Sequence, residues 1–298
     1  MNRFQAFLQE EKIGIAYDAP FLAARHASVG VGGLAPIAFY PSGVAEAIGI
    51  LSRLEKKGIP YRVLGNMTNV LPPDQGIEEA YVITRRMRKM DVGEKLFAEA
   101  GVMSGALVHA CMGHGLGGVE FLVGIPCTVG GAAFMNAGVQ GRYMNDVLES
   151  VLVYESGEVK TLPVSECGYA YKESVFMHGK KVILGATFRL KKTGAKSVAE
   201  KRAEYLRRRT NLPVGKSMGC VFKNPSGQSA GKLIEGAGLK GLRLGGAYVS
   251  EQHANFIING GGATASEIEK LIQVIKNAVR AQYGIELEEE IRYLDKTE

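Results

Sequence analysis

Few residues in this sequence have side chains that suggest chemistry. The segment G-C-V-F-K-N-P (Gly219–Pro225) holds Cys220 between a glycine and an amide-bearing turn. A cysteine is most often a small buried hydrophobe, so a chemical role for this thiol is one of two readings. The acidic run L-E-E-E-I-R (Leu287–Arg292) places its glutamates on alternating faces of a predicted strand. Such a run is usually solvated, and the residues alone leave its role open.

A second candidate is the stretch G-I-P-C-T-V-G-G-A-A-F-M-N-A-G-V-Q-G (Gly124–Gly141), in which Asn136 is the obvious polar side chain. Glycine is used where the backbone takes a positive φ or approaches a neighbour too closely for a Cβ atom. We therefore expect a main-chain surface against a flat or anionic ligand, with amide N–H groups as donors. The alternative is a tightly turned strand pair in a core without a ligand.

Two glycine motifs resemble nucleotide-binding signatures but lack the required context. The segment Gly113–Gly118 satisfies G-x-G-x-x-G, yet a helix-like segment precedes it where the dinucleotide fingerprint requires a strand. Gly215-Lys216-Ser217 resembles the end of a phosphate-binding loop, but the first glycine of that loop would fall on Thr210. Neither motif predicts a nucleotide site.

Cysteine and histidine spacing indicates neither a disulfide framework nor a metal site. The four cysteines are far apart and form no C-x-x-C pair, and the five histidines include no H-E-x-x-H pattern. The start of the chain has no apolar core typical of a signal peptide, and no apolar run approaches the ~18 residues of a membrane span. We therefore expect a cytoplasmic protein that is not associated with a membrane.

Charge and composition indicate a globular protein that attracts anions. The 298 residues are 46% hydrophobic and 22% charged, with a net charge of +6. That length corresponds to two or three domains. The densest basic clusters, Arg85–Lys89 and Arg207–Arg209, are not interleaved with aromatic residues as in single-strand nucleic-acid binders. We favour solvated faces that also attract anionic small molecules over a nucleic-acid partner.

Hydrophobic spacing predicts the elements that must position these residues. Residues 35–85 are typical of a βαβ unit, with strands at Pro36–Tyr40, Tyr61–Leu64 and Tyr81–Thr84, a helix at Val44–Lys57 before Gly58, and a turn at Gly65–Asn69. The middle of the chain predicts a helix at Ala106–Met112, a hairpin at Ser150–Leu162, a strand at Lys181–Leu190, a linker at Lys192–Ser197 and a charged helix at Val198–Arg209.

The last third predicts a compact mixed unit. Its expected elements are Ala230–Gly236, strands at Gly246–Ser250 and Ala254–Asn259, a helix that starts at a capping box of Thr264 and Glu267 and ends at Gly284, and a terminal strand at Glu286–Leu294. From the residues alone, the chain is an α+β protein that binds an anionic cofactor or substrate.

Seven motifs, in this order, resemble the UDP-N-acetylenolpyruvoylglucosamine reductase family over roughly residues 20–294. They are R-H-A-S-V-G-V-G-G (Arg25–Gly33), L-G-N-M-T-N-V-L-P-P-D-Q-G (Leu64–Gly76), G-I-P-C-T-V-G-G-A-A-F-M-N-A-G (Gly124–Gly138), Y-K-E-S (Tyr171–Ser174), G-C-V-F-K-N-P (Gly219–Pro225), S-E-Q-H-A-N-F-I-I-N (Ser250–Asn259) and L-E-E-E-I-R (Leu287–Arg292). The short gap between Ser174 and the strand at Lys181 resembles the family form that lacks an extra substrate-covering loop.

The resemblance implies a fold and an activity. The fold would be α+β, with a two-part FAD-binding fold of the PCMH/vanillyl-alcohol-oxidase type at residues 1–88 and 89–195. A C-terminal α/β substrate domain would follow at 196–298. The implied enzyme uses noncovalent FAD and NADPH to reduce the UDP-sugar UDP-N-acetylglucosamine enolpyruvate to UDP-N-acetylmuramate for peptidoglycan synthesis. Two rivals are a paralogue that reduces another substrate and a flavin- or nucleotide-binding protein without turnover.

Family resemblance also implies roles for particular residues. Cys220 stands where the family has a serine proton donor, while Lys172 and Glu290 would stabilise charge on the enolic carboxylate. The residues implied in substrate binding are Tyr171, Lys223, Asn224, His253 and Asn255. Those implied in FAD binding are Gly65, Asn66, Met67, Thr68, Asn69, Val70, Gly124, Ile125, Pro126, Thr128, Gly130, Gly131, Ala132, Asn136, Ala137 and Gly138.

This sequence departs from the family pattern at four places. Cysteine for serine at position 220 keeps a hydrogen donor, and Lys172 for arginine keeps the charge but loses the bidentate fork. The glycine-rich G-G-G-S-N reads Gly65–Asn69 with larger side chains in its middle, and Cys127 replaces a glycine. The last two changes put Cβ atoms where we expect the backbone to approach the cofactor.

Overall fold

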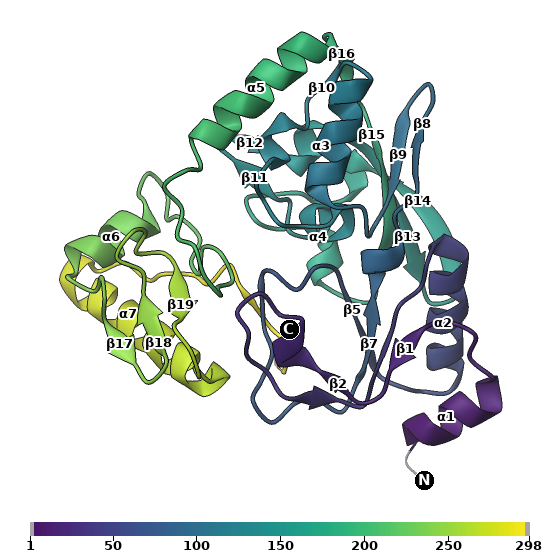
Figure 1. The fold of residues 1–298 in the computed structure, drawn as a ribbon, viewed down its shortest axis with the longest axis horizontal. Coiled ribbons are helices and arrows are strands. Elements are labelled where there is room, and N and C mark those ends of the chain that lie inside the picture. Colours follow the sequence, from purple (N-terminus) through teal and green to yellow (C-terminus); the bar gives the residue numbers. More distant parts are fainter. Residues whose placement is uncertain (1–2, 296–298) are drawn as a thin grey trace.

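The computed structural model describes residues 3–295, which form three parts in sequence order. Figure 1 shows two parts built on β-sheets and a third part, with α6 and α7, to one side of them. Helix α5 leads from the second part toward the third. Each part contributes to the walls of one large cavity, so the fold matters here mainly for how it brings those walls together.

The first part is a four-stranded sheet in the order β1-β4-β7-β5, where β4, β7 and β5 are parallel and β1 is antiparallel. Because β5 and β7 are parallel, the loops after both strands leave the same edge of the sheet. The elements are α1 (Arg3–Glu11), β1 (Tyr17–Asp18), β2 (Phe21–Leu22), β3 (Leu34–Ala35), β4 (Ile37–Phe39), α2 (Val44–Lys56), β5 (Tyr61–Leu64), β6 (Val70–Leu71) and β7 (Ala80–Ile83).

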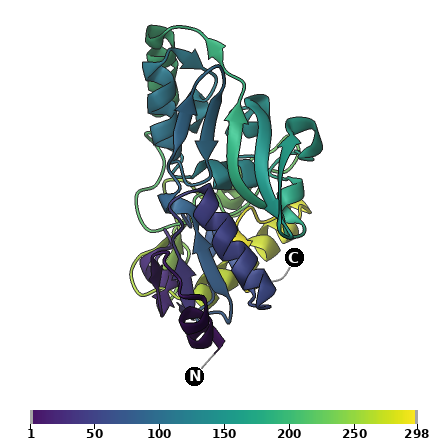
Figure 2. The ribbon, with the colours of Figure 1, turned by 90° about the vertical axis from the view of Figure 1, so that its right-hand side faces the viewer.

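The second part is a five-stranded antiparallel sheet in the order β14-β13-β15-β9-β8, with α3 and α4 beside it. Figure 2 shows this sheet next to α2 of the first part. Its elements are β8 (Met90–Val92), β9 (Leu96–Glu99), α3 (Ser104–Gly113), β10 (Leu116–Gly117), α4 (Val129–Phe134), β11 (Gly138–Val139), β12 (Arg142–Tyr143), β13 (Leu148–Glu155), β14 (Glu158–Pro163), β15 (Val182–Phe188) and β16 (Lys191–Lys192).

The third part packs a three-stranded sheet, β17-β18-β19, against α7. Helix α7 begins at a capping box in which Thr264 Oγ1 accepts from the Glu267 amide and Glu267 Oε2 accepts from the Thr264 amide, both at 3.1 Å. The elements are α5 (Ala195–Arg207), α6 (Ala230–Gly236), β17 (Arg243–Leu244), β18 (Ala247–Val249), β19 (Ile257–Asn259), α7 (Ala265–Tyr283) and β20 (Arg292–Tyr293).

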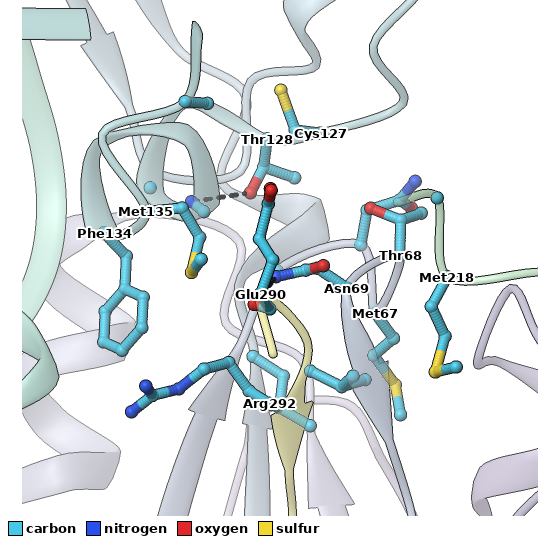
Figure 3. Close-up of a pocket in the computed structure, with 18 of the residues that line it drawn as sticks. Met67, Thr68, Asn69, Cys127, Thr128, Phe134, Met135, Met218, Glu290 and Arg292 are labelled. Atoms are coloured by element: carbon cyan, nitrogen blue, oxygen red, sulfur yellow. Dashed lines mark hydrogen bonds between the residues drawn. The ribbon is translucent and has the colours of Figure 1, made fainter. Parts of the chain in front are cut away.

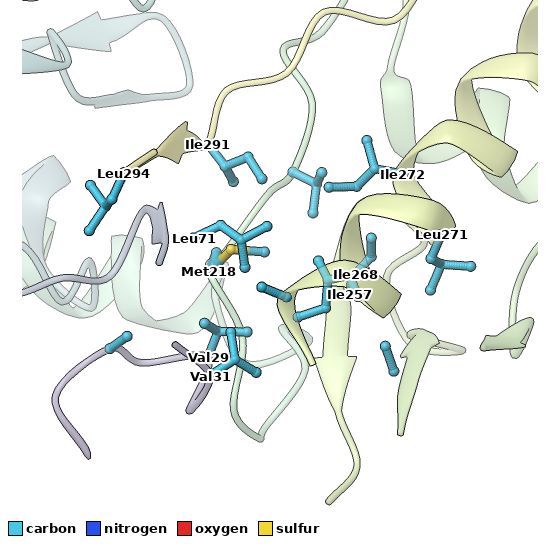
Figure 4. Close-up of a cluster of buried hydrophobic side chains, with 14 of the residues drawn as sticks. Val29, Val31, Leu71, Met218, Ile257, Ile268, Leu271, Ile272, Ile291 and Leu294 are labelled. Carbon is cyan, nitrogen blue, oxygen red and sulfur yellow. The ribbon is translucent and has the colours of Figure 1, made fainter. Parts of the chain in front are cut away.

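The chain end returns from the third part to the first. Strand β20 pairs in parallel with β6, joining Arg292 to Val70 and Tyr293 to Leu71. One apolar core spans this junction (Figure 4), where Leu71 of the first part lies near Ile291 and Met218. A second core joins α1 and α2 to the fully buried Tyr154 of β13. One core thus joins the first part to the third and the other joins the first part to the second, while the division into domains at residues 88 and 195 stays a prediction.

Most elements expected from the sequence are confirmed within a few residues, including the βαβ unit, the hairpin and the capping box of α7. The predicted linker Lys192–Ser197 is wrong, because β16 pairs with β10 and α5 already starts at Ala195. The terminal strand is shorter than expected, since only Arg292–Tyr293 pair as a regular strand. The preceding glutamates lie outside a regular strand, and Glu289 forms an isolated bridge with Phe222.

Candidate active site

A cavity of about 2010 Å³ lies where the three parts meet. The loop after β5, the segment around α4, the turn at Tyr171–Lys172, the segment between α5 and α6 and the C-terminal segment all contribute to its walls. Figure 3 shows Glu290 between the wall that carries Phe134 and Met135 and the wall that carries Thr68 and Met218. Drug-sized ligands occupy pockets of about 300–1,000 Å³, so this cavity has room for more than one such ligand.

The three residues expected to be catalytic all line this cavity, although they come from motifs far apart in the sequence. The Nζ atom of Lys172 donates to Oε1 of Glu290 at 2.7 Å, and only 14% and 15% of the two side chains are exposed. Cys220 is close enough for the charges of both residues to act on its thiol. The structure therefore brings a protected ion pair and a thiol together at one wall.

Local backbone contacts hold each of these side chains. Lys172 has a positive φ of 57° in a turn closed by reciprocal hydrogen bonds between Ala170 and Glu173. The amide of Glu290 donates to the carbonyl of Val221 at 2.7 Å, which fixes the C-terminal segment beside Cys220. Asn69 Nδ2 also donates to the carbonyl of Glu290 at 3.0 Å and ties that segment to the loop after β5.

Burial and charge determine the protonation of the groups at this wall. Burial raises the pKa of the Cys220 thiol to about 12, the charge of Glu290 adds to that rise, and the nearby Lys172 and Arg209 oppose it. Burial alone would lower the pKa of Lys172, but the charge and hydrogen bond of Glu290 outweigh burial and raise it. At neutral pH, Cys220 is therefore a protonated thiol and Lys172 a cation.

The loop Gly65–Asn69 lines the cavity and is fastened to the opposite loop. Asn66 Nδ2 and Thr68 Oγ1 both donate to the carbonyl of Pro126, at 2.8 and 3.0 Å. Among the residues that the structure describes, the amides of 66–69 donate to no protein acceptor. The side chains of Asn66 and Thr68 thus brace the loop while its backbone donors stay available for an anion.

Part of the small-residue stretch has its backbone amides bound within the protein. It contains the short helix α4, whose cap Thr128 accepts from the Gly131 amide at 3.2 Å, and then the β11–β12 strand pair. The amides of Val129 and Gly130 donate to backbone carbonyls of Val102 and Ala100. These two amides are therefore not available as ligand donors, and a ligand-binding role for the rest of the stretch stays a prediction.

Residues expected to contact FAD mostly line the cavity, with two exceptions. Those on the cavity wall are Gly65, Asn66, Met67, Thr68, Asn69, Val70, Gly124, Ile125, Pro126, Thr128, Gly130, Gly131, Ala137 and Gly138. Ala132 is buried at 1% exposure and lies off the wall. Asn136 is also off the wall, because its Nδ2 donates to the Ala170 carbonyl and its Oδ1 accepts from the Asn145 amide. Asn136 instead supports the turn that carries Lys172.

The five expected substrate residues divide in the same way. Tyr171, Asn224 and Asn255 line the cavity, and Tyr171 with Asn224 also lines an adjoining pocket of about 840 Å³. Both polar atoms of Asn255 are bound to the backbone of Phe222, so Asn255 supports the segment next to Cys220. Lys223, paired with Glu288, and His253, stacked edge-on with Phe256, lie outside the main cavity.

Sequence reasoning missed several residues of the cavity wall. Met135, Met218 and Phe134 line it (Figure 3), and so does Arg209 from the end of the basic cluster after α5. Arg292 also lines it, with its guanidinium 5.8 Å from the centre of the Phe134 ring. Phe134, Met135 and Arg292 lie inside quoted motifs and Met218 directly precedes one, so nearness to a motif was the available signal. For Arg209 the signal was its place in a run that could also cap a helix.

The cavity wall offers FAD unbonded backbone donors and an apolar surface, next to a tight contact between two loops. A Cβ atom on Gly65 would lie 2.4 Å from Thr128 Oγ1, so glycine is required where the two cavity loops meet. The unpaired amides at 66–69 suit a pyrophosphate, and the apolar wall around Phe134 and Met135 suits a flat ring. No candidate metal cluster occurs in the described part of the chain. None of its helices is long and apolar enough to cross a membrane.

Comparisons with known proteins agree with this geometry. Residues 35–162 match the model of an FAD-binding domain, and residues 210–294 match that of the C-terminal domain of UDP-N-acetylenolpyruvoylglucosamine reductase. Fold, cavity and these matches define an FAD-containing oxidoreductase.

The particular family follows from full-length relatives. UDP-N-acetylenolpyruvoylglucosamine reductase of Geobacter metallireducens is 40% identical over 97% of this chain and 96% of the relative. The enzyme of the same name from Chloroherpeton thalassium is 39% identical over 92% of each chain. The crystal structure of the Thermus caldophilus enzyme superposes with a TM-score of 0.82 at 34% identity, over 94% of this chain and 99% of that one. The chain belongs to the UDP-N-acetylenolpyruvoylglucosamine reductase family.

Proposed function

We propose that this protein reduces UDP-N-acetylglucosamine enolpyruvate to UDP-N-acetylmuramate with electrons from NADPH. This proposal rests on the position of Cys220 beside the Lys172–Glu290 pair. All three residues line the cavity to which the loop Gly65–Asn69 and the segment Gly124–Gly138 also contribute. Membership of the family supports the same reaction. The proposed partner is a small UDP-sugar, and the cytoplasmic location expected from the sequence is part of the proposal.

Each residue at the wall has a task that its environment supports. Bound FAD supplies the hydride transfer between NADPH and the enolpyruvyl double bond. Cys220 holds a proton on its sulfur at neutral pH and would deliver it to the α-carbon while hydride reaches the β-carbon. Lys172, held in place by Glu290, would stabilise the negative charge that develops on the enolic carboxylate.

The loop Gly65–Asn69 and the segment Gly124–Gly138 would contact different parts of the cofactor. The amides at 66–69 would bind the cofactor's pyrophosphate. The wall from Gly124 to Gly138 would shape the cavity around the ring system, with Cys127 among the atoms that line it. Tyr171 and Asn224, which line both pockets, would contact the UDP-sugar where it leaves the main cavity.

A spectroscopic cycle tests this function. The purified protein should carry a yellow flavin, and NADPH should bleach it under anaerobic conditions. Addition of the enolpyruvyl UDP-sugar should then restore the colour and yield UDP-N-acetylmuramate. Protein that takes up no FAD would sink the proposal, whereas bleaching without reoxidation by this substrate would indicate a different acceptor.

A further inference from the structure

Arg209 is a half-buried cation on the wall of the cavity. It follows the end of α5, and its backbone amide donates to the carbonyl of Leu206. Within residues 3–295, no carboxylate lies within ion-pair distance of its guanidinium and no hydrogen-bond acceptor faces it. Its neighbour Arg208, by contrast, is exposed and pairs with Glu204.

A glycine in the facing loop leaves space for the Arg209 side chain. Gly124 has a positive φ of 74°, and a Cβ atom there would lie 3.1 Å from Nε of Arg209. The guanidinium acts electrostatically on the thiols of both Cys127 and Cys220. Arg209 therefore contacts the wall at Gly124 and is close enough to both thiols for its charge to act on them.

Charge balance makes Arg209 different from three other cations on the cavity wall. Lys172 is neutralised by Glu290, Arg62 by Glu79 and Lys181 by Glu155. The thiols beside Arg209 are neutral, because burial raises the pKa of Cys127 to about 11 and that of Cys220 to about 12. A half-buried guanidinium surrounded by neutral groups favours an anion that brings its own charge.

We propose that Arg209 binds the carboxylate of the enolpyruvyl group. Its planar fork matches a carboxylate in bidentate fashion, which the ammonium of Lys172 does not. Binding there would hold the α-carbon near Cys220. This inference rests on the proposed function and deepens it by adding a substrate-binding residue.

Paired ligands separate a carboxylate contact from a diphosphate contact. UDP-N-acetylmuramate carries the carboxylate and UDP-N-acetylglucosamine lacks it, while both carry the same diphosphate. Each would be titrated into oxidised holoenzyme by calorimetry, in the wild type, Arg209→Gln, Arg209→Lys and the exposed control Arg208→Gln. Arg208 does not line the cavity, so its variant keeps the same loss of charge at a neighbouring position.

We expect Arg209→Gln to weaken the binding of UDP-N-acetylmuramate by about 10- to 100-fold, which is the range for a lost charge-assisted contact. Its affinity for UDP-N-acetylglucosamine should stay near wild type, Arg209→Lys should be intermediate, and Arg208→Gln should match the wild type. Equal weakening of both ligands, no weakening, loss of FAD or slower bleaching by NADPH would each overturn the proposal. Because the titration needs no turnover, its result is independent of the flavin cycle that tests the proposed function.

Discussion

Cys220 replaces the serine that the family resemblance led us to expect, and its surroundings determine whether this exchange preserves an acid. A thiol in water has a pKa of about 8.5 and would be partly ionised in mild alkali. Burial here raises the pKa of Cys220 to about 12, and Glu290 adds to the rise. An acid works only while it holds its proton, and a raised pKa means that this proton is lost only at higher pH.

The rate of flavin reoxidation by the enolpyruvyl substrate should therefore show no decrease due to ionisation of Cys220 between about pH 7 and 10. Cys220→Ser should keep the step, because serine retains a hydroxyl proton at the same position. Cys220→Ala should slow it by about 10²- to 10⁴-fold, the usual contribution of a positioned acid. Rapid-mixing absorbance of the reduced holoenzyme measures the step.

Two results would argue against this role of Cys220. One is a fall in rate with an apparent pKa near 8.5 that disappears in Cys220→Ser. The other is an alanine variant as fast as wild type. Retention of FAD and of bleaching by NADPH in every variant is the control, because neither should depend on this proton.

Among the elements, those with strong local signals were predicted well. Helix α7 has an apolar stripe, a capping box at Thr264 and a left-handed Gly284 at its end, and all of these act within a few residues. Helix α4 was not predicted, because six residues rich in glycine and alanine carry little helix signal. Contacts to Ala100 and Val102, distant in sequence, satisfy its first amides.

The site, like the elements, was predicted where local sequence carries the signal and missed where contacts between distant residues decide. Motif resemblance identified Cys220, Lys172 and Glu290, and the structure brings them to one wall. It did not reveal that Asn136 serves the turn carrying Lys172, since that depends on two hydrogen bonds formed only in the fold. Arg209 was interpreted as part of a solvated basic cluster, and its burial against Gly124 on the cavity wall distinguishes it from Arg208.

The contact between the two cavity loops gives a prediction at the scale of elements. Gly65→Ala should destabilise the protein by about 1–3 kcal/mol and weaken FAD binding, because the new Cβ would lie 2.4 Å from Thr128 Oγ1. Thr128 is 1% exposed and caps α4, so it has little room to yield. Urea unfolding of the apoprotein and fluorescence titration with FAD measure the two effects.

Gly49→Ala in α2 is the matched control. Nothing lies within 4 Å of a Cβ atom at that position. Since alanine favours a helix interior over glycine by roughly 0.5–1 kcal/mol, this variant should be as stable as wild type or slightly more so. Wild-type stability and FAD affinity in Gly65→Ala would show that the loops adjust freely, and that the close contact of Gly65 with Thr128 does not shape the cofactor site.

At the scale of the whole molecule, the cavity depends on cores that cross the chain's three parts. The C-terminal segment carries Glu290 into the cavity and buries Ile291 and Leu294 against Leu71 of the first part (Figure 4). The same core continues into α7 through Ile268 and Leu271. Loosening the third part should therefore disturb the cofactor site, even where the altered residue is not on the cavity wall.

Ile268→Ala tests this coupling, because Ile268 is fully buried in α7 and lies off the cavity wall. The truncation should cost about 2–5 kcal/mol. If the shared core makes unfolding cooperative, urea transitions followed by far-ultraviolet circular dichroism and by flavin fluorescence should coincide in the wild type and shift together in the variant. Val274→Ala, at a 41% exposed position of the same helix, should change the free energy of unfolding from either transition by less than about 0.5 kcal/mol. A dichroism transition that moves alone, with the flavin signal unchanged, would mean that the third part unfolds independently of the FAD-binding parts.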